Sequence, residues 1–251
     1  MEQRGLRRKA WRGAIAALVL AALPGGLFAG SFRVMPVRIV LDRDEPVSAM
    51  SIRNDADEPA RVQLRVVAWR QDNGEDVFEP THDILANPPL FEMAARSGQT
   101  ARIGLRVPPG AKEKSYRVFI DEIPPAAAPR PGEVRTLLRI SIPLFVPPVR
   151  LSSRLEWHAR MAADGIVVTL RNAGNAHVQV NRLSIVAAGG KVIATQDLSA
   201  YLLPGTTRDL PVRITAPIGA NRKIVVEAMT DQGNVRSELV VEARSGAGVV
   251  G

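Results

Sequence analysis

The sequence predicts an all-β protein made of two β-sandwich domains, and three observations support this prediction. Short runs of alternating apolar and polar residues recur through most of the chain, as expected for strands with one buried face. Turn-forming dipeptides separate the runs, among them Asn54-Asp55, Asn73-Gly74 and Pro88-Pro89. The pattern stops at Pro147-Pro148 and then restarts. We therefore expect two sandwiches joined by a short proline-rich hinge.

The first 29 residues resemble a secretory signal peptide. Basic residues precede a short apolar run, Ala14–Leu23, and Ala29 offers a small residue for cleavage before Gly30. The run is too short to span a bilayer comfortably, so we expect removal of this segment, with a retained anchor as the alternative, and no stable membrane insertion afterwards. Removal takes away five Lys or Arg residues and one Glu, and the formal net charge falls from +8 to +4. Nucleic acid is therefore not an expected partner.

The sequence contains no cysteine, which constrains how an exported protein is stabilised. Without disulfides the mature chain depends on its apolar cores, and its length allows one or two of them. We expect a signal peptide at 1–29, a first domain at 30–147, a second domain at 148–245 and a frayed tail at 246–251.

Each predicted domain contains a series of alternating runs and no convincing helix pattern. In the first domain the runs cover 37–41, 62–68, 101–107 and 115–123. In the second domain they cover 155–159, 166–170, 178–180, 210–214, 224–228 and 235–241.

The stretch 115–148 joins two apolar strand patterns through a proline-rich loop at 126–132. We expect the second strand to run from Val134 to Val146. One alternating set, here called the donor row, is mostly apolar, while Arg135 and Arg139 fall in the other set. The donor row consists of Val134, Thr136, Leu138 and Ile140. Edge strands are usually blunted by charge, proline or shortness, so this row either packs on its own sheet or stays available to another chain.

The sequence does not indicate catalysis, a metal site or a cofactor. The only histidines, His82, His158 and His177, lack the spacing of metal ligands. A nucleophile motif such as G-x-S-x-G is absent. Asp121 and Glu122 are neighbours in a predicted strand, so their side chains point to opposite faces. We therefore expect that the protein is not an enzyme and binds neither cofactor nor metal.

Two arginines, Arg38 and Arg117, lie among apolar residues of predicted strands. A guanidinium group in such surroundings must reach either water or an anion. Each side chain could lie on a solvated outer face, or it could bind a carboxylate, which matches the planar guanidinium. Arg139 is a third candidate, although it can simply point outward with Arg135.

Several segments, in this order and spacing, resemble the PapD-like periplasmic pilus chaperones. They include Pro36–Asp42, Asn87–Phe91, Glu122–Pro125 and Ile142–Val146. The Pro143 pattern and the cysteine-free loop look closer to the archaic branch, which serves spore-coat-U-like pilins. The resemblance implies two immunoglobulin-like sandwiches and a periplasmic chaperone that binds pilin subunits and delivers them to an outer-membrane usher.

The resemblance also implies roles for the residues noted above. A pilin lacks the last strand of its sandwich and borrows one from the chaperone, here about residues 133–141, so the donor row would enter the pilin groove. A basic pair would hold the C-terminal carboxylate of the pilin. Arg38 fits the first position, but the second aligns with Pro143, so Arg117, or failing that Arg139, is the expected substitute. An exported two-domain β-sandwich acting as a surface or adhesion subunit is the alternative function.

Overall fold

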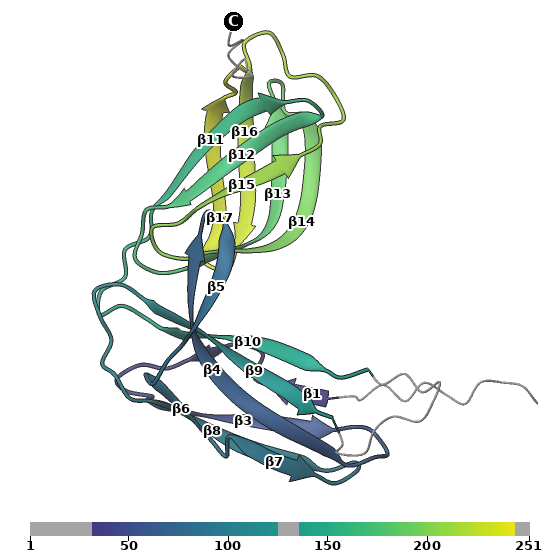
Figure 1. Cartoon of the computed structure of the whole chain (residues 1–251). Helices are drawn as coiled ribbons and strands as arrows, with labels where there is room; N and C mark the ends of the chain where they lie inside the picture. The colour runs from purple at the N-terminus through teal and green to yellow at the C-terminus, as the bar shows by residue number, and fades with distance from the viewer. Residues whose placement is uncertain (1–31, 125–135, 244–251) are drawn as a thin grey trace, which may run out of the picture.

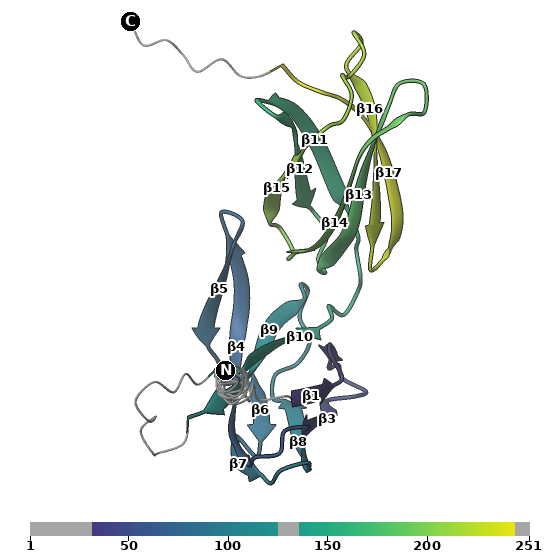
Figure 2. The ribbon, with the colours of Figure 1, turned by 90° about the vertical axis from the view of Figure 1, so that its right-hand side faces the viewer.

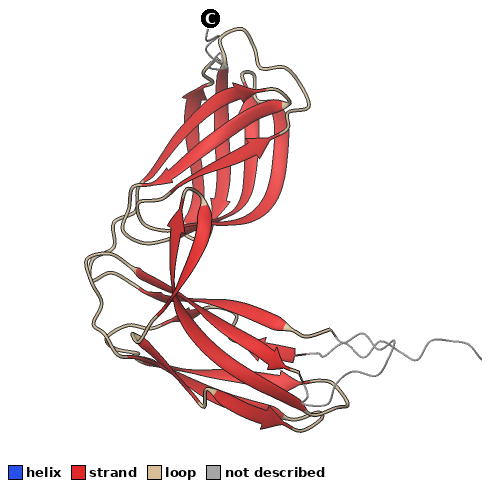
Figure 3. Cartoon of the chain, viewed as in Figure 1, coloured by secondary structure: helices blue, strands red, loops and turns tan. Residues whose placement is uncertain are grey.

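The computed structural model describes residues 32–124 and 136–243, and all regular elements in these ranges are β-strands (Figure 1, Figure 3). The predicted signal peptide and tail lie outside the described residues, as does Val134 of the donor row. In the described part of the chain, no helix is long and apolar enough to cross a membrane. The prediction of an all-β protein is confirmed.

The first sandwich packs a four-stranded sheet against a six-stranded sheet. The smaller sheet has the order β1 (Phe32–Met35), β3 (Val47–Asn54), β8 (Gly98–Leu105), β6 (Ile84–Asn87). The larger sheet has the order β2 (Ile39–Val40), β10 (Arg139–Val146), β9 (Lys114–Ile123), β4 (Ala60–Asp72), β5 (Glu75–Pro80), with β7 (Leu90–Met93) also paired to β4. Alternate residues of both sheets form one buried core, which includes Ile52, Ile103 and Val118.

The second sandwich packs a three-stranded sheet against a four-stranded sheet. The first has the order β11 (Leu155–Ala162), β12 (Gly165–Asn172), β15 (Thr207–Val212). The other has the order β14 (Val192–Leu202), β13 (Val178–Ala187), β16 (Lys223–Thr230), β17 (Gly233–Val240). Its separate core includes Val168, Leu183 and Val226. The predicted boundary at Pro147-Pro148 stays a prediction and falls in the connection between β10 and β11.

The two sandwiches meet at an angle, and the β4–β5 hairpin of the first reaches toward the second (Figure 1, Figure 2). Asn73 and Gly74 form its tip, with φ of 50° and 85°. Positive φ at both central residues is what a type I′ turn requires. Near the tip, the Gln71 side chain donates to the carbonyl of Tyr201 at 3.0 Å and accepts from the amide of Leu203 at 3.0 Å. The hairpin is therefore tied to the second domain.

Two predicted strands are longer than the strands observed. The strand expected from about Val134 begins at Arg139. At Leu138 the pairing with β9 is incomplete: its carbonyl still accepts from the Glu122 amide at 2.9 Å, but its amide donates to the Glu122 side chain at 3.1 Å rather than to the backbone carbonyl. The strand expected over 37–41 is limited to β2, since only its two residues pair with β10. Val37, which we expected on the buried face, is consequently exposed.

The tight cores make core truncation costly. Ile52 on β3 is fully buried, so we expect Ile52→Ala to lower the free energy of unfolding by about 2–5 kcal/mol through lost burial and a residual cavity. Val47→Ala on the same strand removes an exposed side chain and should change it by less than about 0.5 kcal/mol. Urea denaturation of both variants measures the difference, and equal stabilities would contradict the assignment of Ile52 to the core.

Candidate functional site

Arg38 and Arg117, together called the arginine pair, flank Pro143 at one level of the larger sheet. Arg117 on β9 lies directly opposite Pro143 on β10. Ile39 pairs with Leu144 on the other edge of β10, and Arg38 precedes it by one residue. Adjacent strands are about 4.8 Å apart, so the backbones of the arginine pair are about 10 Å apart. Because Ile39 and Leu144 face the core, the arginine pair belongs to the opposite face of the sheet.

Tyr201, at the end of β14 in the second domain, contacts both members of the arginine pair. Its hydroxyl accepts a hydrogen bond from Arg38 Nη2 at 3.3 Å. Its ring centroid is 5.4 Å from Arg117 Cζ and meets the Trp69 ring edge-on at 5.3 Å. No pattern in the sequence points to Tyr201 as part of this site. A partly buried tyrosine is expected to find a hydrogen-bond partner for its hydroxyl, but the sequence does not indicate which residue this partner is.

The guanidinium group of Arg117 packs on an aromatic ring but has no carboxylate partner among the described residues. Its Cζ lies 3.9 Å from the Trp69 ring centroid, a cation–π contact. Its Nε is buried without a hydrogen-bond partner, and no ion pair among residues 32–124 and 136–243 includes this side chain. Burial lowers the pKa of Arg117, and the negative charge of Asp76 partly offsets this effect. Such a half-buried guanidinium can accept an anion.

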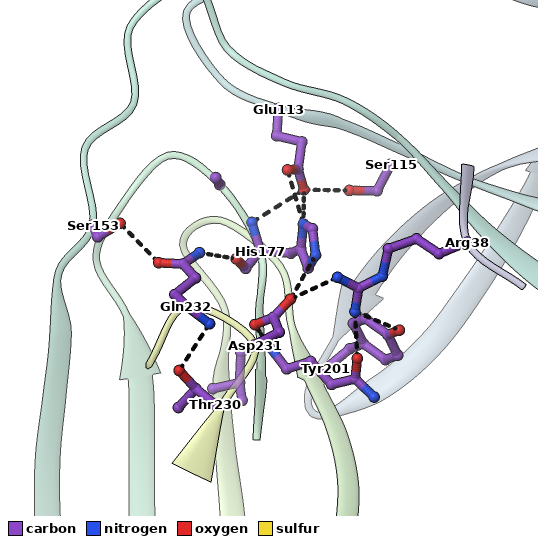
Figure 4. A network of polar contacts seen from close by, with 12 residues as sticks. Arg38, Glu113, Ser115, Ser153, His177, Tyr201, Thr230, Asp231 and Gln232 are labelled. Carbon is purple, nitrogen blue, oxygen red and sulfur yellow. Dashed lines mark hydrogen bonds and ion pairs between the residues drawn. The ribbon is translucent and has the colours of Figure 1, made fainter. Parts of the chain in front are cut away.

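Arg38, in contrast, already holds a carboxylate. Its Nη1 donates to Asp231 Oδ2 at 3.0 Å (Figure 4), and its Nη2 also donates to the side chain of Gln179. Asp231 and Gln179 belong to the second domain, so this arginine links the two sandwiches. Neither Arg38 nor Arg117 shows the fully solvated outer-face position that was the alternative at the sequence level.

Arg139 lies apart from the arginine pair. It is four residues along β10 from Pro143, a distance of about 13 Å. Arg139 Nε donates to Asp121, which also accepts from Arg65 Nε at 2.9 Å. Burial alone would raise the pKa of Asp121, but the hydrogen bonds from Arg139 and Arg65 outweigh it and lower the pKa. The ion pair with Asp121 therefore satisfies the Arg139 guanidinium group, and no bound carboxylate is needed to explain its position.

Among the described residues, the outer edge of β10 has a strand partner over only part of its length. The strand pairs with β9 over all of Arg139–Val146, but β2 covers only Leu144 and Phe145 on the other side. Over Arg139–Pro143, no strand in the described ranges pairs with this edge. Polar backbone groups there are free to pair with an added strand.

The three described members of the donor row differ in exposure. Thr136 is exposed, whereas Leu138 and Ile140 are partly buried. Ile140 lies opposite Ile120 and packs partly against the core of its own domain. Only part of the Ile140 apolar surface therefore remains available to another protein, and the role of the donor row in pilin binding stays a prediction.

A chain of polar contacts, here called the junction network, crosses between the domains (Figure 4). It consists of Glu113 and Arg38 from the first domain and His177 and Asp231 from the second. His177 Nδ1 is 2.8 Å from a Glu113 oxygen, and His177 Nε2 is 3.3 Å from Asp231 Oδ2. The ring of His177 stacks on Phe145, with centroids 3.5 Å apart. In the described part of the chain, no group of three or more His, Cys, Asp or Glu residues is placed to hold a metal ion.

The charge of His177 makes the junction sensitive to pH. Burial alone would lower the pKa of His177, but the neighbouring carboxylates of Asp231 and Glu113 raise it above its ordinary value of 6.5. Because this pKa is higher in the folded than in the unfolded state, protonation of His177 stabilises the folded state. The stabilisation is fully present below about pH 6.5, and it is lost as the pH rises through the folded-state pKa. The pKa of Asp231 is lowered, because contacts with His177, Gln179 and Arg38 outweigh burial, so its contribution is lost only in acid.

We therefore expect unfolding midpoints in urea to fall as the pH rises above about 6.5, as the imidazolium loses its proton. In His177→Gln this dependence should be weaker, since the titrating group is gone. The matched control is His158→Gln, which removes an exposed histidine and should keep the pH dependence. Parallel pH profiles for the parent chain and His177→Gln would contradict the prediction.

Comparison with known proteins gives consistent matches. Residues 31–152 match the family model described as pili and flagellar-assembly chaperone, PapD N-terminal domain. The chaperone protein MrkB of Klebsiella pneumoniae is 25% identical over 217 residues, which cover 82% of this chain and 88% of MrkB. These matches confirm the predicted resemblance to the PapD-like pilus chaperones.

Solved structures agree on the fold. A chain of the CsuC–CsuE chaperone–tip adhesion subunit pre-assembly complex, from archaic Csu pili of Acinetobacter baumannii, gives a TM-score of 0.61 at 22% identity and covers 86% of this chain and 100% of that one. A chain of the Salmonella enterica SafA pilin–SafB chaperone complex gives a TM-score of 0.55 at 21% identity, covering 86% and 98%. The predicted pair of immunoglobulin-like sandwiches is confirmed.

Proposed function

Because the first domain of this chain belongs to the PapD N-terminal family of pilus and flagellar-assembly chaperones, we propose that the protein is a periplasmic chaperone for unassembled pilin subunits. It binds a pilin by lending it a strand and then delivers the pilin to an outer-membrane usher. Similarity in fold to the Csu complex agrees with a place in the archaic branch, which is part of the proposal. The family that residues 31–152 match is one of chaperones, so the proposed activity of this protein is binding of pilin subunits rather than catalysis.

The observation that carries the proposal is the open edge of β10. Its backbone groups over Arg139–Pro143 face no strand in the described ranges. Leu138 and Ile140 offer apolar surface beside that edge. An added pilin strand would complete the backbone hydrogen bonds, and each apolar side chain that it buries fully would contribute about 1.5–3 kcal/mol.

The arginine pair supplies the second part of the proposal. A pilin strand along β10 would approach Pro143, which cannot donate from its side chain but has a guanidinium on each side. Arg117 has the freer charge, and Arg38 already binds a carboxylate. A terminal carboxylate held there would fix the register of the added strand, while the apolar contacts supply most of the affinity.

The test is purification of the tagged full-length chain from the periplasm of cells that also express a spore-coat-U-like pilin, the class that the archaic branch serves. We expect a one-to-one complex that survives size-exclusion chromatography, and a pilin that is degraded or aggregated when the chaperone is missing. Recovery of the tagged chain on the cell surface, without a bound pilin, would instead support the surface-subunit alternative.

A further inference from the structure

The carboxylate of Asp231 binds Arg38, the same residue that is proposed to bind the C-terminal carboxylate of a pilin. It lies in the turn between β16 and β17, and its Oδ2 is 3.0 Å from Arg38 Nη1. The same oxygen is 3.3 Å from His177 Nε2, and Oδ1 accepts the Gln179 amide at 2.8 Å. The Asp231 side chain is only 13% exposed. This aspartate is therefore a positioned ligand of Arg38 rather than a chance surface contact.

We propose that Asp231 is an internal stand-in for the terminal carboxylate of a partner. In the free protein it occupies Arg38. When a partner binds, its terminal carboxylate takes over Arg38, and Asp231 keeps His177 as its counter-ion. The inference rests on the proposed function in taking the partner to be a pilin, but the occupancy of Arg38 in the free protein does not depend on it.

The exchange is feasible because Asp231 has a second cation beside it. Two carboxylates on one half-buried arginine repel each other, so the arriving group favours release of Asp231 from Arg38. Leaving a buried charge unpaired would be costly, but His177 already contacts Asp231 and remains there. The number of ion pairs at the junction is therefore the same before and after the exchange.

The surroundings of His177 make it the natural reporter of this exchange. The charged groups that face it are Glu113 from the connection before β9 and Asp231 from the β16–β17 turn. Arg38 lies behind Asp231, and the Tyr201 ring centroid is 5.9 Å from the ring of His177. When Arg38 no longer shares Asp231, the negative charge acts on His177 alone and favours its protonated form.

The exchange on Arg38 also determines which class of ligand can bind. A free chain-terminal carboxylate can replace the Asp231 carboxylate on Arg38, whereas a neutral amide at the same position cannot compete with it. Asp231 as well as the arginine pair would then make the protein select partners that end in a free C-terminal carboxylate. A partner lacking that carboxylate would leave Asp231 in place.

The test is an NMR titration of the histidine side chains in the full chain. We expect the midpoint of His177 to shift upward in Arg38→Gln relative to the parent, while His82 and His158, both exposed, stay unchanged as internal controls. Arg160→Gln removes an arginine from an exposed pair with Asp209 and should leave His177 unmoved. This arm needs no partner, so it stands even if the chain binds no pilin.

The second arm repeats the titration on the complex with the co-expressed pilin. We expect the same upward shift of His177, and no shift with a pilin whose C-terminus has been converted to the amide by semisynthesis. An unchanged His177 midpoint in a stable complex with the free-acid pilin would overturn the exchange. An unchanged midpoint in Arg38→Gln would overturn the internal occupancy, whereas failure to form any complex would count against the proposed function alone.

Discussion

Leu138→Asp is expected to abolish pilin capture while the chaperone remains folded. Leu138 lies one residue before β10, beside its open edge, and it is only partly buried in the free protein. In the complex its side chain would enter the pilin core, where losing it costs about 1.5–3 kcal/mol. An ionised carboxylate in that core adds a further desolvation cost. Affinity should therefore fall by about 100-fold or more, as measured by co-purification and by titration of separated components.

The adjacent residue offers a matched control. Leu137 is 44% exposed and belongs to the other alternating set, so Leu137→Asp introduces the same charge one position away and should keep most of the capture. Because the Leu138 amide donates to Glu122, a local change at that contact is a second possible cause of loss. Thr136→Asp avoids the contact and should show the same loss. Equal capture by all three variants and the parent would remove the donor row from the mechanism.

The fold was largely predictable because period-two alternation of apolar and polar residues depends only on the local sequence of each strand. A strand with one buried face places apolar residues at every second position, as in β4, where Val62 and Leu64 are buried and Gln63 is exposed. Strand ends were less predictable, since they depend on the neighbouring strand. Val37 continues the alternation of Ile39 and Leu41, yet it is exposed because β10 pairs with only two residues there.

The junction network could not be predicted in the same way. Its four members are distant in the sequence, and Arg38 and Asp231 are separated by 193 positions. Nothing in the sequence around His177 indicates an ion pair, while the structure places it between two carboxylates. Such contacts depend on how two separate domains are set against each other, which alternation within a strand does not record. The sequence did identify Arg38 as a guanidinium that must reach either water or an anion, but it did not indicate that an internal carboxylate lies within its reach.

Arg117→Ala is expected to weaken pilin capture by about 10- to 100-fold. The estimate follows from a charge-assisted hydrogen bond to a carboxylate, which contributes about 1.5–3 kcal/mol. Arg117 lies opposite Pro143, where the resemblance calls for a basic residue, and its Nε has no partner in the described part of the chain. Truncation leaves Arg38 as the only member of the arginine pair. Titration with the co-expressed pilin measures the loss, and urea denaturation checks that the variant is folded.

Two further variants separate charge from packing at this position. Arg117→Lys keeps the positive charge but loses the planar group that stacks on Trp69, so we expect intermediate capture. Arg139→Ala removes a guanidinium that Asp121 already pairs with, about 13 Å along the strand from Pro143, and should leave capture near the parent value. If Arg139→Ala abolished capture and Arg117→Ala did not, the carboxylate would bind near Asp121 instead. The register of the added strand would then differ by four residues, so the same alternating set would still face the pilin but each donor-row side chain would meet a different part of its groove.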